Sequence, residues 1–356
     1  MSDLVIASHK GPYGVTFAED GLERLDAAVP AGAHVIVDAR VAELYSDRMR
    51  NILSGPSVLR IEATEANKSL ERFPAYVDHL VGRSLRRDQP LIAVGGGIIQ
   101  DITCFLAATM LRGVSWHFYP TTLLAQCDSC IGSKSSINCG EAKNILGTFT
   151  PPNQVVISTR FLDTLDERDV RSGVGEMLKV HAIAGPEAFA GFASGYDAMF
   201  TERAAMVAAI RRSLEIKKAV IEVDEFDTGP RLVFNYGHSF GHAIEAATDF
   251  AIPHGIAVTI GMDMANWISA ELGIGTRDHW AAGHGVLKKN YRGFEAFPVP
   301  VDRVLAALAK DKKNTGSGSV TLILPDAQGR VFRGVHAADD RFRQLCRTYL
   351  EEVRAA

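Results

Sequence analysis

Short apolar runs alternate with helix-length stretches along the first third of the chain. Three of these runs have the β-branched, buried character of strands: residues 34–40, 57–63 and 91–97. Residues 40–53 and 68–87, which lie between them, have the length of helices. Strands that alternate with helices form βαβ units, and the right-handed crossover of these units leaves few topologies. The pattern therefore predicts an N-terminal α/β domain with a Rossmann-like, doubly wound parallel sheet.

The pattern becomes mainly helical near residue 160, after an apolar segment at 151–158. From there to residue 290, Ala, Leu, Glu and Lys dominate and few strands are expected. The elements predicted in this half are helices at 204–223, 235–248 and 254–272, a strand at 320–325 and an amphipathic helix from residue 337. We therefore divide the chain into an N-terminal domain, residues 1–160, and a mainly α-helical C-terminal domain, residues 161–356.

Composition narrows the class of protein. The 356 residues fit one large domain or two ordinary ones, and 47% hydrophobic with 22% charged residues is typical of a globular chain. A formal net charge of −4 argues against broad nucleic-acid binding. No apolar run has the length of a membrane helix, and the N-terminal segment lacks the features of a secretory signal. We expect a cytoplasmic protein without membrane or nucleic-acid partners.

The five cysteines do not suggest a disulfide framework. Cys127 and Cys130 form a CxxC motif, but no matching second pair accompanies it. We therefore expect small buried residues at these positions and not a zinc or redox site.

Gly95, Gly96 and Gly97 follow a predicted strand and precede a helix-like run. Without side chains, such a turn lets the backbone approach a phosphate, and the helix start offers unpaired N–H groups. The spacing is GGGxxxD and not the GxGxxG of the usual dinucleotide fingerprint. A nucleotide contact and a plain strand-to-helix turn are therefore equally good interpretations of this motif.

Residues 119–144 form the densest polar segment of the chain. Hydroxyl, amide and charged groups spaced through small residues suit a phosphate or a polyol. They belong to Thr121, Thr122, Asp128, Ser129, Ser133, Lys134, Ser135, Ser136, Asn138, Lys143 and Asn144. A solvated loop is the alternative, but the segment also keeps Ile131, Ile137 and Ile145, which favours a binding site.

Three histidines and one glutamate are candidate metal ligands. His238 and His242 lie one helical turn apart, and His254 is expected in the loop after their helix. Glu176 and Lys179 share a face of another helix. The glutamate of a HExxH protease motif is absent. Satisfied core histidines are the simpler alternative, but each histidine has a glycine neighbour, and a His, His, Glu set with an open position suits catalytic zinc.

Basic residues recur near these groups, at Arg112, Lys134, Lys143, Lys179, Lys217, Arg231, Lys312 and Lys313. Each one alone would be a solvated surface charge. Because they lie within motifs that are also rich in Gly, Asn and His, they indicate a doubly anionic substrate, such as a phosphorylated sugar acid.

Several long motifs, taken together, resemble the dehydroquinate synthase family, the sugar-phosphate cyclases. They are VGGGIIQDITCFLAATMLRGV, PTTLLAQCDSCIGSKSSIN with a following KN, GEMLKV, FNYGHSFGHAIEA, PHGIAV and KDKK. The resemblance covers roughly residues 34–325. It implies an NAD-binding N-terminal domain, a C-terminal domain that carries a zinc (or cobalt) ion, catalysis in the cleft between them, and a homodimer.

The resemblance also implies roles for individual residues. The NAD contacts would be Asp38, Glu65, Lys68, Gly95, Gly96, Asp101, Thr121, Thr122, Asp128 and Lys143. The metal ligands would be Glu176, His238 and His254. The substrate phosphate would meet His242, Lys134, Asn144, Asn235 and Lys312. The substrate hydroxyls and carboxylate would face Lys179, Lys217 and Arg231, with Arg112 reaching across from a partner subunit.

The implied reaction converts 3-deoxy-arabino-heptulosonate 7-phosphate to 3-dehydroquinate and phosphate, a step of the shikimate pathway. NAD transiently oxidises the sugar, phosphate is eliminated, hydride returns, and an intramolecular aldol step closes the ring. The enzyme is therefore expected to be a lyase without net redox change. Lys217 and Arg231 suit the carboxylate of this substrate, and Asn235 matches the dehydroquinate-forming pattern.

Three departures from the family pattern keep other functions open. Ser133 replaces a glycine, Ile256 replaces a glutamate, and Pro230 precedes Arg231. The chain therefore also fits a divergent, cyclitol-forming cyclase that takes sedoheptulose 7-phosphate or glucose 6-phosphate. A metal-dependent alcohol dehydrogenase of the related two-domain type is a second enzyme class, and a binding protein without activity is a third class.

Overall fold

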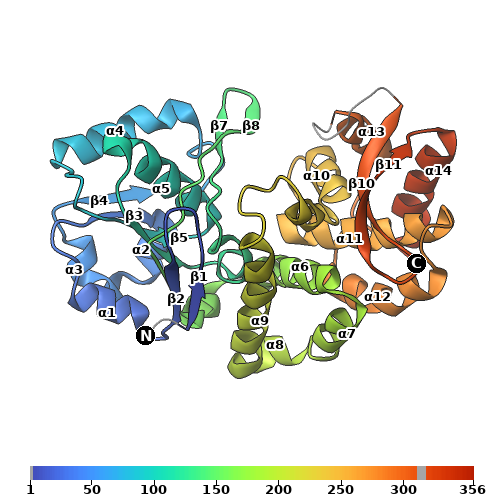
Figure 1. Ribbon diagram of the computed structural model, residues 1–356, viewed down its shortest axis with the longest axis horizontal. Helices are drawn as coiled ribbons and strands as arrows, with labels where there is room; N and C mark the ends of the chain where they lie inside the picture. Colours follow the sequence, from blue (N-terminus) through green and yellow to red (C-terminus); the bar gives the residue numbers. More distant parts are fainter. Residues whose placement is uncertain (1–2, 311–317) are drawn as a thin grey trace. The chain divides into compact units, whose positions relative to one another are not determined.

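The computed structural model describes residues 3–310 and 318–356 and has two compact units (Figure 1). Their bounds are Met1–Leu165 with Lys217–Phe226 for the first unit, and Asp166–Ile216 with Asp227–Ala356 for the second. The end of α9 (Arg203–Ile221) thus returns to the first unit. The assignment of NAD binding to residues 1–160 and of metal and substrate binding to residues 161–356 stays a prediction, because a compact unit does not by itself show what it binds.

A seven-stranded sheet forms the centre of the first unit, in the order β1-β2-β9-β6-β5-β3-β4. Neighbouring strands from β2 to β4 are parallel, whereas β1 pairs antiparallel with β2. The strands are β1 (Leu4–Ile6), β2 (Tyr13–Phe17), β3 (His34–Asp38), β4 (Val58–Ile61), β5 (Leu91–Gly95), β6 (Trp116–Pro120) and β9 (Gln154–Ile157). β5 is buried along its whole length, as its continuous apolar run predicts.

The helices of this unit are short apart from α5, which packs on β3, β5 and β6. They are α1 (Gly21–Ala27), α2 (Ala39–Leu44), α3 (Arg50–Leu53), α4 (Phe73–Gly82) and α5 (Gly97–Thr109). The three strands predicted first are confirmed as β3, β4 and β5. The stretch 40–53 is not one helix, because Tyr45 and Met49 leave the helical conformation, with φ of −113° and −126°, and bury their side chains in the core.

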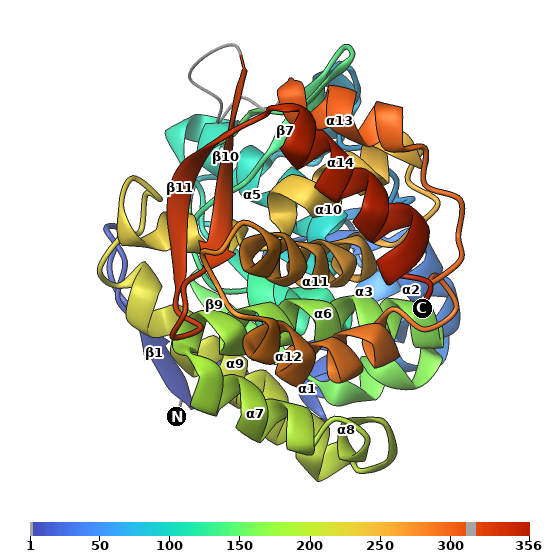
Figure 2. The same cartoon turned by 90° about the vertical axis from the view of Figure 1, so that its right-hand side faces the viewer.

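Helix α11 (His254–Glu271) forms the core of the second unit. Its residues from Gly255 to Ser269 are all buried, because other elements surround this helix. Figure 2 shows it among α6 (Glu167–Ala184), α10 (His238–Ala247), α12 (Arg277–Asn290) and α14 (Asp340–Thr348). The other elements are α7 (Pro186–Ser194), α8 (Ala198–Thr201), α13 (Val301–Ala309), β10 (Ser319–Pro325) and β11 (Val331–Ala337).

Most elements predicted for this unit are confirmed, and so is the α/β class with a mainly helical second part. Helices predicted at 204–223 and 254–272 correspond to α9 and α11, and the strand at 320–325 is β10. The helix predicted at 235–248 begins at His238, because Gly237 has a left-handed φ of 74°. Among the described residues, no helix has both the length and the hydropathy needed to cross a membrane.

Candidate active site

The carboxyl ends of three neighbouring strands bring the glycine turn of the first unit together with residues predicted to contact NAD. β3 has β4 on one side and β5 on the other, so the order of the strands in the sheet reverses between β3 and β5. Doubly wound sheets bind ligands at such a switch point, outside the carboxyl ends of the strands. Asp38 ends β3, Gly95 ends β5 and Thr121 follows β6. The fold therefore places all three at one edge of the sheet.

Gly96 and Gly97 keep side chains away from the start of α5. A Cβ atom at Gly96 would lie 2.8 Å from Thr122 Cγ2, whereas a Cβ atom at Gly97 would meet no described atom within 4 Å. Thr122 is itself fixed, since its Oγ1 accepts from Ala125 N at 3.2 Å. The open space beside the helix start suits an anion such as a dinucleotide phosphate, because the first N–H groups of a helix lack intrahelical partners.

Buried Lys68 connects residues predicted to contact NAD with one predicted to contact phosphate. Its Nζ donates to Asp101 Oδ2 and to Asn144 Oδ1, both at 3.0 Å, and lies 3.7 Å from Glu65 Oε1. Ser136 Oγ also donates to Asn144 Oδ1, at 2.9 Å. Burial raises the pKa of Asp101, although the Lys68 charge opposes this shift. The amide oxygen of Asn144 is thus engaged, and its amide nitrogen is the end that can meet a ligand.

The polar segment begins with a π-helical turn, η4 (Ala125–Ser129), which holds Asp128 against Lys217. Lys217 Nζ donates to Asp128 O at 2.6 Å and lies 3.0 Å from its Oδ1. Both side chains are largely buried. Cys127 and Cys130 are buried as predicted. The structure therefore joins a residue predicted for NAD to one predicted for the substrate carboxylate.

The rest of the polar segment is more exposed. It ends in a hairpin of β7 (Ile137–Cys139) and β8 (Ala142–Leu146), and the exposed Lys143 lies on β8. Lys134, before the hairpin, is also exposed. Arg112 is exposed as well, in a turn where both Leu111 and Arg112 have left-handed backbones, with φ of 52° and 64°. The three cations stay predicted site residues.

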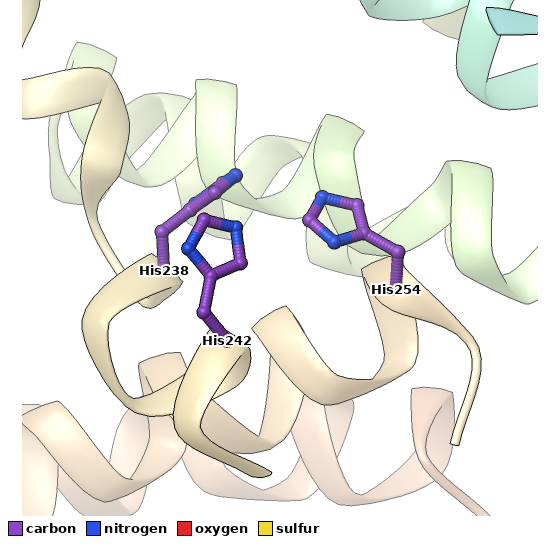
Figure 3. Close-up of side chains that lie close together, drawn as sticks. All are labelled: His238, His242 and His254. Atoms are coloured by element: carbon purple, nitrogen blue, oxygen red, sulfur yellow. The ribbon is translucent and has the colours of Figure 1, made fainter. Parts of the chain in front are cut away.

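Four predicted residues meet in the second unit. Glu176 Oε1, from α6, lies 3.4 Å from His254 Nε2 and 3.7 Å from His238 Nε2. Figure 3 shows the His238 and His242 rings from α10 beside the His254 ring. One nitrogen atom from each of the three rings lies within 4.8 Å of the others. His254 is the first residue of α11, so its predicted position in a loop is wrong; Pro253, before it, starts this helix in place of a longer loop.

Close helix packing explains why these side chains meet. A Cβ atom at Gly175 would lie 2.2 Å from Gly255 O, and a Cβ atom at Gly255 would lie 1.8 Å from Ser172 O. α6 and α11 therefore touch backbone to backbone, which is possible only where side chains are absent. Glu176 and His254 directly follow and precede these two glycines. The glycine neighbours noted in the sequence are thus the reason why the two helices present their polar groups to each other.

Neighbouring charges set the protonation of this cluster. Lys179 Nζ forms a buried ion pair with Glu176 Oε2. Burial acts to raise the pKa of Glu176, but Lys179 and the histidines outweigh it and hold this pKa well below its ordinary value. Burial, together with the Lys179 charge, holds the pKa of His238 well below 6.5. Burial also acts to lower the pKa of His254, but Glu176 and Glu245 outweigh it and raise this pKa to about 10.

The donor set fits a divalent cation. Zn–N and Zn–O bonds are about 2.0–2.2 Å long, so the ligand atoms of a tetrahedral site lie about 3.4 Å apart. The separations of 3.4 and 3.7 Å around Glu176 Oε1 are close to that value. This oxygen is buried and makes no hydrogen bond of good geometry with a described residue. His238 Nδ1 meets Tyr236 O at 3.1 Å, which leaves Nε2 for the cation.

The remaining predicted residues lie close in sequence to this cluster or outside the described part. Arg231 is buried, and Asn235 Nδ2 donates to Leu232 O at 3.1 Å in η6 (Pro230–Asn235). His242 is exposed, with its ring centroid 5.2 Å from that of His238. Lys312, predicted to contact phosphate, lies outside the described residues.

Glu245 is a member of the site that the sequence analysis does not single out. Its Oε2 lies 3.1 Å from His254 Nδ1. The available signal is spacing, because Glu245 lies one turn after His242 and two turns after His238, on the same face of α10.

Comparison with known proteins identifies the family of this chain. The family profile described as 3-dehydroquinate synthase N-terminal matches residues 58–172, and the profile described as 3-dehydroquinate synthase C-terminal matches residues 173–314. The 3-dehydroquinate synthase of Agrobacterium fabrum is 35% identical over 332 residues, which cover 90% of this chain and 87% of that protein. The chain belongs to the 3-dehydroquinate synthase family. The membership predicted from the motifs is therefore confirmed.

Solved structures of two related cyclases share the fold of this family member. The 2-deoxy-scyllo-inosose synthase complexed with carbaglucose-6-phosphate, NAD+ and Co2+ has a TM-score of 0.83 at 22% identity and covers 97% of this chain and 99% of its own. The 2-epi-5-epi-valiolone synthase ValA from Streptomyces hygroscopicus subsp. jinggangensis 5008, with NAD+ and Zn2+ bound, has a TM-score of 0.79 at 26% identity and covers 98% of each chain.

Proposed function

We propose that this protein is a 3-dehydroquinate synthase, an NAD- and zinc-dependent carbon–oxygen lyase that forms 3-dehydroquinate and phosphate from 3-deoxy-arabino-heptulosonate 7-phosphate. The observation that carries the proposal is the 35% identity to an enzyme of that name over 90% of the chain. The geometry supports it, since one unit has a glycine turn suited to a dinucleotide and the other has a donor set suited to a divalent cation.

Glu176, His238 and His254 are the proposed metal ligands. When bound, zinc or cobalt supplies Lewis-acid polarisation of substrate oxygens, and NAD supplies a hydride acceptor and donor. Lys179 keeps Glu176 ionised and so preserves it as a ligand. His238 is neutral, because its pKa is held low, and it offers Nε2 while its other ring nitrogen faces the Tyr236 carbonyl.

Lys217, Arg231 and Lys179 are the proposed contacts of the substrate carboxylate and hydroxyls. All three are buried in the structure, with 6%, 8% and 3% of their surface exposed. Burying a cation is costly unless an anion compensates it. Asp128 and Glu176 already pair with Lys217 and Lys179, and the carboxylate of an acid substrate would add a further anion beside these cations.

Asn144, His242, Asn235 and Lys134 are the proposed phosphate contacts in the described part of the chain, with Lys312 beyond it. Asn144 supports this role most directly, because Lys68 and Ser136 both donate to its amide oxygen. Its amide nitrogen therefore presents donors, which is the polarity that a phosphate oxygen requires.

A homodimer in which Arg112 acts at the partner's site is part of the proposal. Left-handed backbones at non-glycine residues cost about 1–3 kcal/mol each and are concentrated at functional sites. Leu111 and Arg112 adopt them in succession, and both side chains are exposed. This conformation supports a role for Arg112 outside its own fold.

A cyclase for a different sugar phosphate is the second candidate. Two observations favour it: the fold similarity to two cyclases that are not 3-dehydroquinate synthases, and the residues Ser133, Ile256 and Pro230, which depart from the family pattern.

A substrate panel distinguishes the candidates. The full chain, loaded with NAD and Zn2+ or Co2+, is incubated with 3-deoxy-arabino-heptulosonate 7-phosphate, sedoheptulose 7-phosphate or glucose 6-phosphate. We expect phosphate and 3-dehydroquinate in equal amounts from the first substrate alone, without accumulation of NADH. Phosphate released only from a neutral sugar would establish the second candidate. Net NADH formation from a simple alcohol would establish a dehydrogenase.

A further inference from the structure

We propose that Glu245 is a positioning residue for the metal site, which it serves by fixing the ring of His254. The inference rests on the proposed function, because it takes His254 to be a metal ligand. The Glu245 carboxylate meets His254 Nδ1, with Oε2 at 3.1 Å from this nitrogen.

The His254 ring lies between two carboxylates, one at each nitrogen. Nδ1 meets Glu245 Oε2 at 3.1 Å, and Nε2 lies 3.4 Å from Glu176 Oε1. A carboxylate accepts hydrogen bonds only, so Nδ1 carries the hydrogen that meets Glu245. Nε2 faces Glu176 Oε1, and a cation held between these two atoms would take the place of a proton on Nε2. A carboxylate partner of this kind also makes the imidazole a stronger ligand.

Packing alone does not hold this ring. The His254 side chain is 35% exposed, whereas the side chains of His238 and Glu245 are 13% and 11% exposed. His254 is also the first residue of α11, so no preceding helical turn confines its side chain. The hydrogen bond that His254 Nδ1 donates to the buried Glu245 is therefore the contact that selects one ring orientation. His238 needs no such help, because it is better buried and Tyr236 O meets its Nδ1.

The position of Glu245 follows from α10. His238, His242 and Glu245 occupy successive turns of one helix face, and this face is turned toward the start of α11. One helix thus supplies a predicted ligand, a predicted phosphate contact and the partner of a ligand from the next helix. The arrangement couples the ring orientation of His254 to the packing of α10 against α11.

Metal affinity tests this inference without any turnover. The full chain is stripped with a chelator and titrated with Co2+, and the dissociation constant and the visible absorption of bound Co2+ are measured. We expect Glu245→Ala to weaken Co2+ binding by about 10- to 100-fold and to alter the spectrum. Glu245→Gln keeps an acceptor oxygen but loses the carboxylate charge, so it should weaken Co2+ binding by a smaller but measurable factor. Asp249→Asn, which removes an exposed carboxylate paired with Arg303, is the matched control and should bind Co2+ like the parent chain.

The possible outcomes separate the two levels of the proposal. If His254→Ala loses Co2+ while Glu245→Ala keeps the parent affinity and spectrum, the positioning role is wrong and the metal site stands. If neither the parent chain nor any variant binds Co2+, both proposals are overturned. The metal-free melting temperature shows whether Glu245→Ala folds, and if it does not, Glu245→Gln decides. Weakened Co2+ binding by a folded Glu245→Gln supports the positioning role. Co2+ affinity and a spectrum like those of the parent chain overturn it.

Discussion

Buried lysines define the chemistry of this protein at the scale of single residues. Lys68, Lys179 and Lys217 are 6%, 3% and 6% exposed, and each pairs with an Asp or Glu that also belongs to the predicted site. A buried ion pair is a weak source of stability, because desolvation offsets most of the attraction. The pairs are therefore consistent with the proposed role of these residues in ligand binding.

Removal of the buried Lys217 or Arg231 side chain should reduce turnover far more than removal of the Lys218 side chain, which lies next to Lys217 in sequence. We expect Lys217→Ala and Arg231→Ala each to reduce kcat/KM for the acid substrate by about 10²- to 10³-fold, as the loss of one preorganised charge does in other sites. Lys218→Ala is the matched control, because Lys218 is the next residue on α9 and pairs instead with Glu222, just after the helix ends. Steady-state phosphate release measures the effect. If both variants keep the kcat/KM of the parent chain, Lys217 and Arg231 do not contact the substrate carboxylate.

Glu225 should make stability depend on pH in the acid range. It accepts from Ser8 Oγ at 2.7 Å and from His9 N at 2.8 Å, and these contacts outweigh burial and lower the pKa of Glu225 below 4.5. A lowered pKa stabilises the folded chain above the unfolded-state value, and this contribution is lost as the pH falls through the folded-state value. Glu225→Gln should therefore be less stable than the parent chain near neutral pH, with the difference shrinking below pH 4.5.

Unfolding free energies from denaturant titrations at several pH values measure this difference. Glu215→Gln is the control, because Glu215 is more exposed than Glu225 and pairs with Arg212, one turn away on α9, at 3.3 Å. A Glu225→Gln deficit of constant size across the pH range would show that the carboxylate charge is not the cause.

At the scale of elements, the crossing of α6 and α11 sets the positions of two of the proposed metal ligands. The two helices approach through glycine, and Glu176 and His254 lie beside the point of contact. Small shifts at such a crossing move side chains by more than the tolerance of a metal site, since ligand distances must be met within a few tenths of an ångström. The packing of α6 against α11 therefore also sets the distance between these two donor side chains.

Adding a methyl group at this crossing should harm both stability and metal binding. We expect Gly255→Ala to destabilise the second unit by about 1–3 kcal/mol or more, because the new Cβ atom must displace backbone of α6. Gly191→Ala, at a position on α7 where a Cβ atom meets nothing within 4 Å, should change stability by less than about 1 kcal/mol and in the favourable direction. Thermal unfolding and Co2+ titration of both variants check this expectation. Tight metal binding by Gly255→Ala would contradict it.

At the scale of the whole molecule, the two compact units should respond to different ligands. If NAD binds the first unit and the metal the second, each ligand stabilises its own unit by mass action, by about 2.7 kcal/mol at a hundredfold excess over the dissociation constant. Hydrogen exchange should then slow in Gly95–Ala107 and its neighbours with NAD, and in α6, α10 and the start of α11 with Co2+.

Peptides from residues 217–226 give this experiment its internal check. They begin within α9, whose earlier residues belong to the second unit, but they themselves belong to the first unit. Protection of these peptides by NAD, and not by Co2+, would support a functional division along the two compact units. Equal protection of both units by either ligand would contradict the assignment of NAD and metal to separate units.

The sequence by itself determined the class of fold and most of the candidate chemistry. Apolar runs such as 91–97 predict buried strands because each residue of a central parallel strand faces other protein. The candidates Glu176, His238, His242 and His254 could be singled out because His and Glu are metal-binding residue types, and the resemblance to a family implied the set Glu176, His238 and His254. These sequence patterns are local, so they can be interpreted without knowledge of contacts between distant segments.

Only the tertiary structure decided which of these residues touch. The approach of Gly175 to Gly255, the bond between Glu245 and His254, and the link from Lys68 to Asn144 join segments that no periodicity relates. The return of residues 217–226 to the first unit is of the same kind. Helical and strand periods describe what one segment presents to its surroundings, whereas the identity of the partner depends on how the whole chain packs.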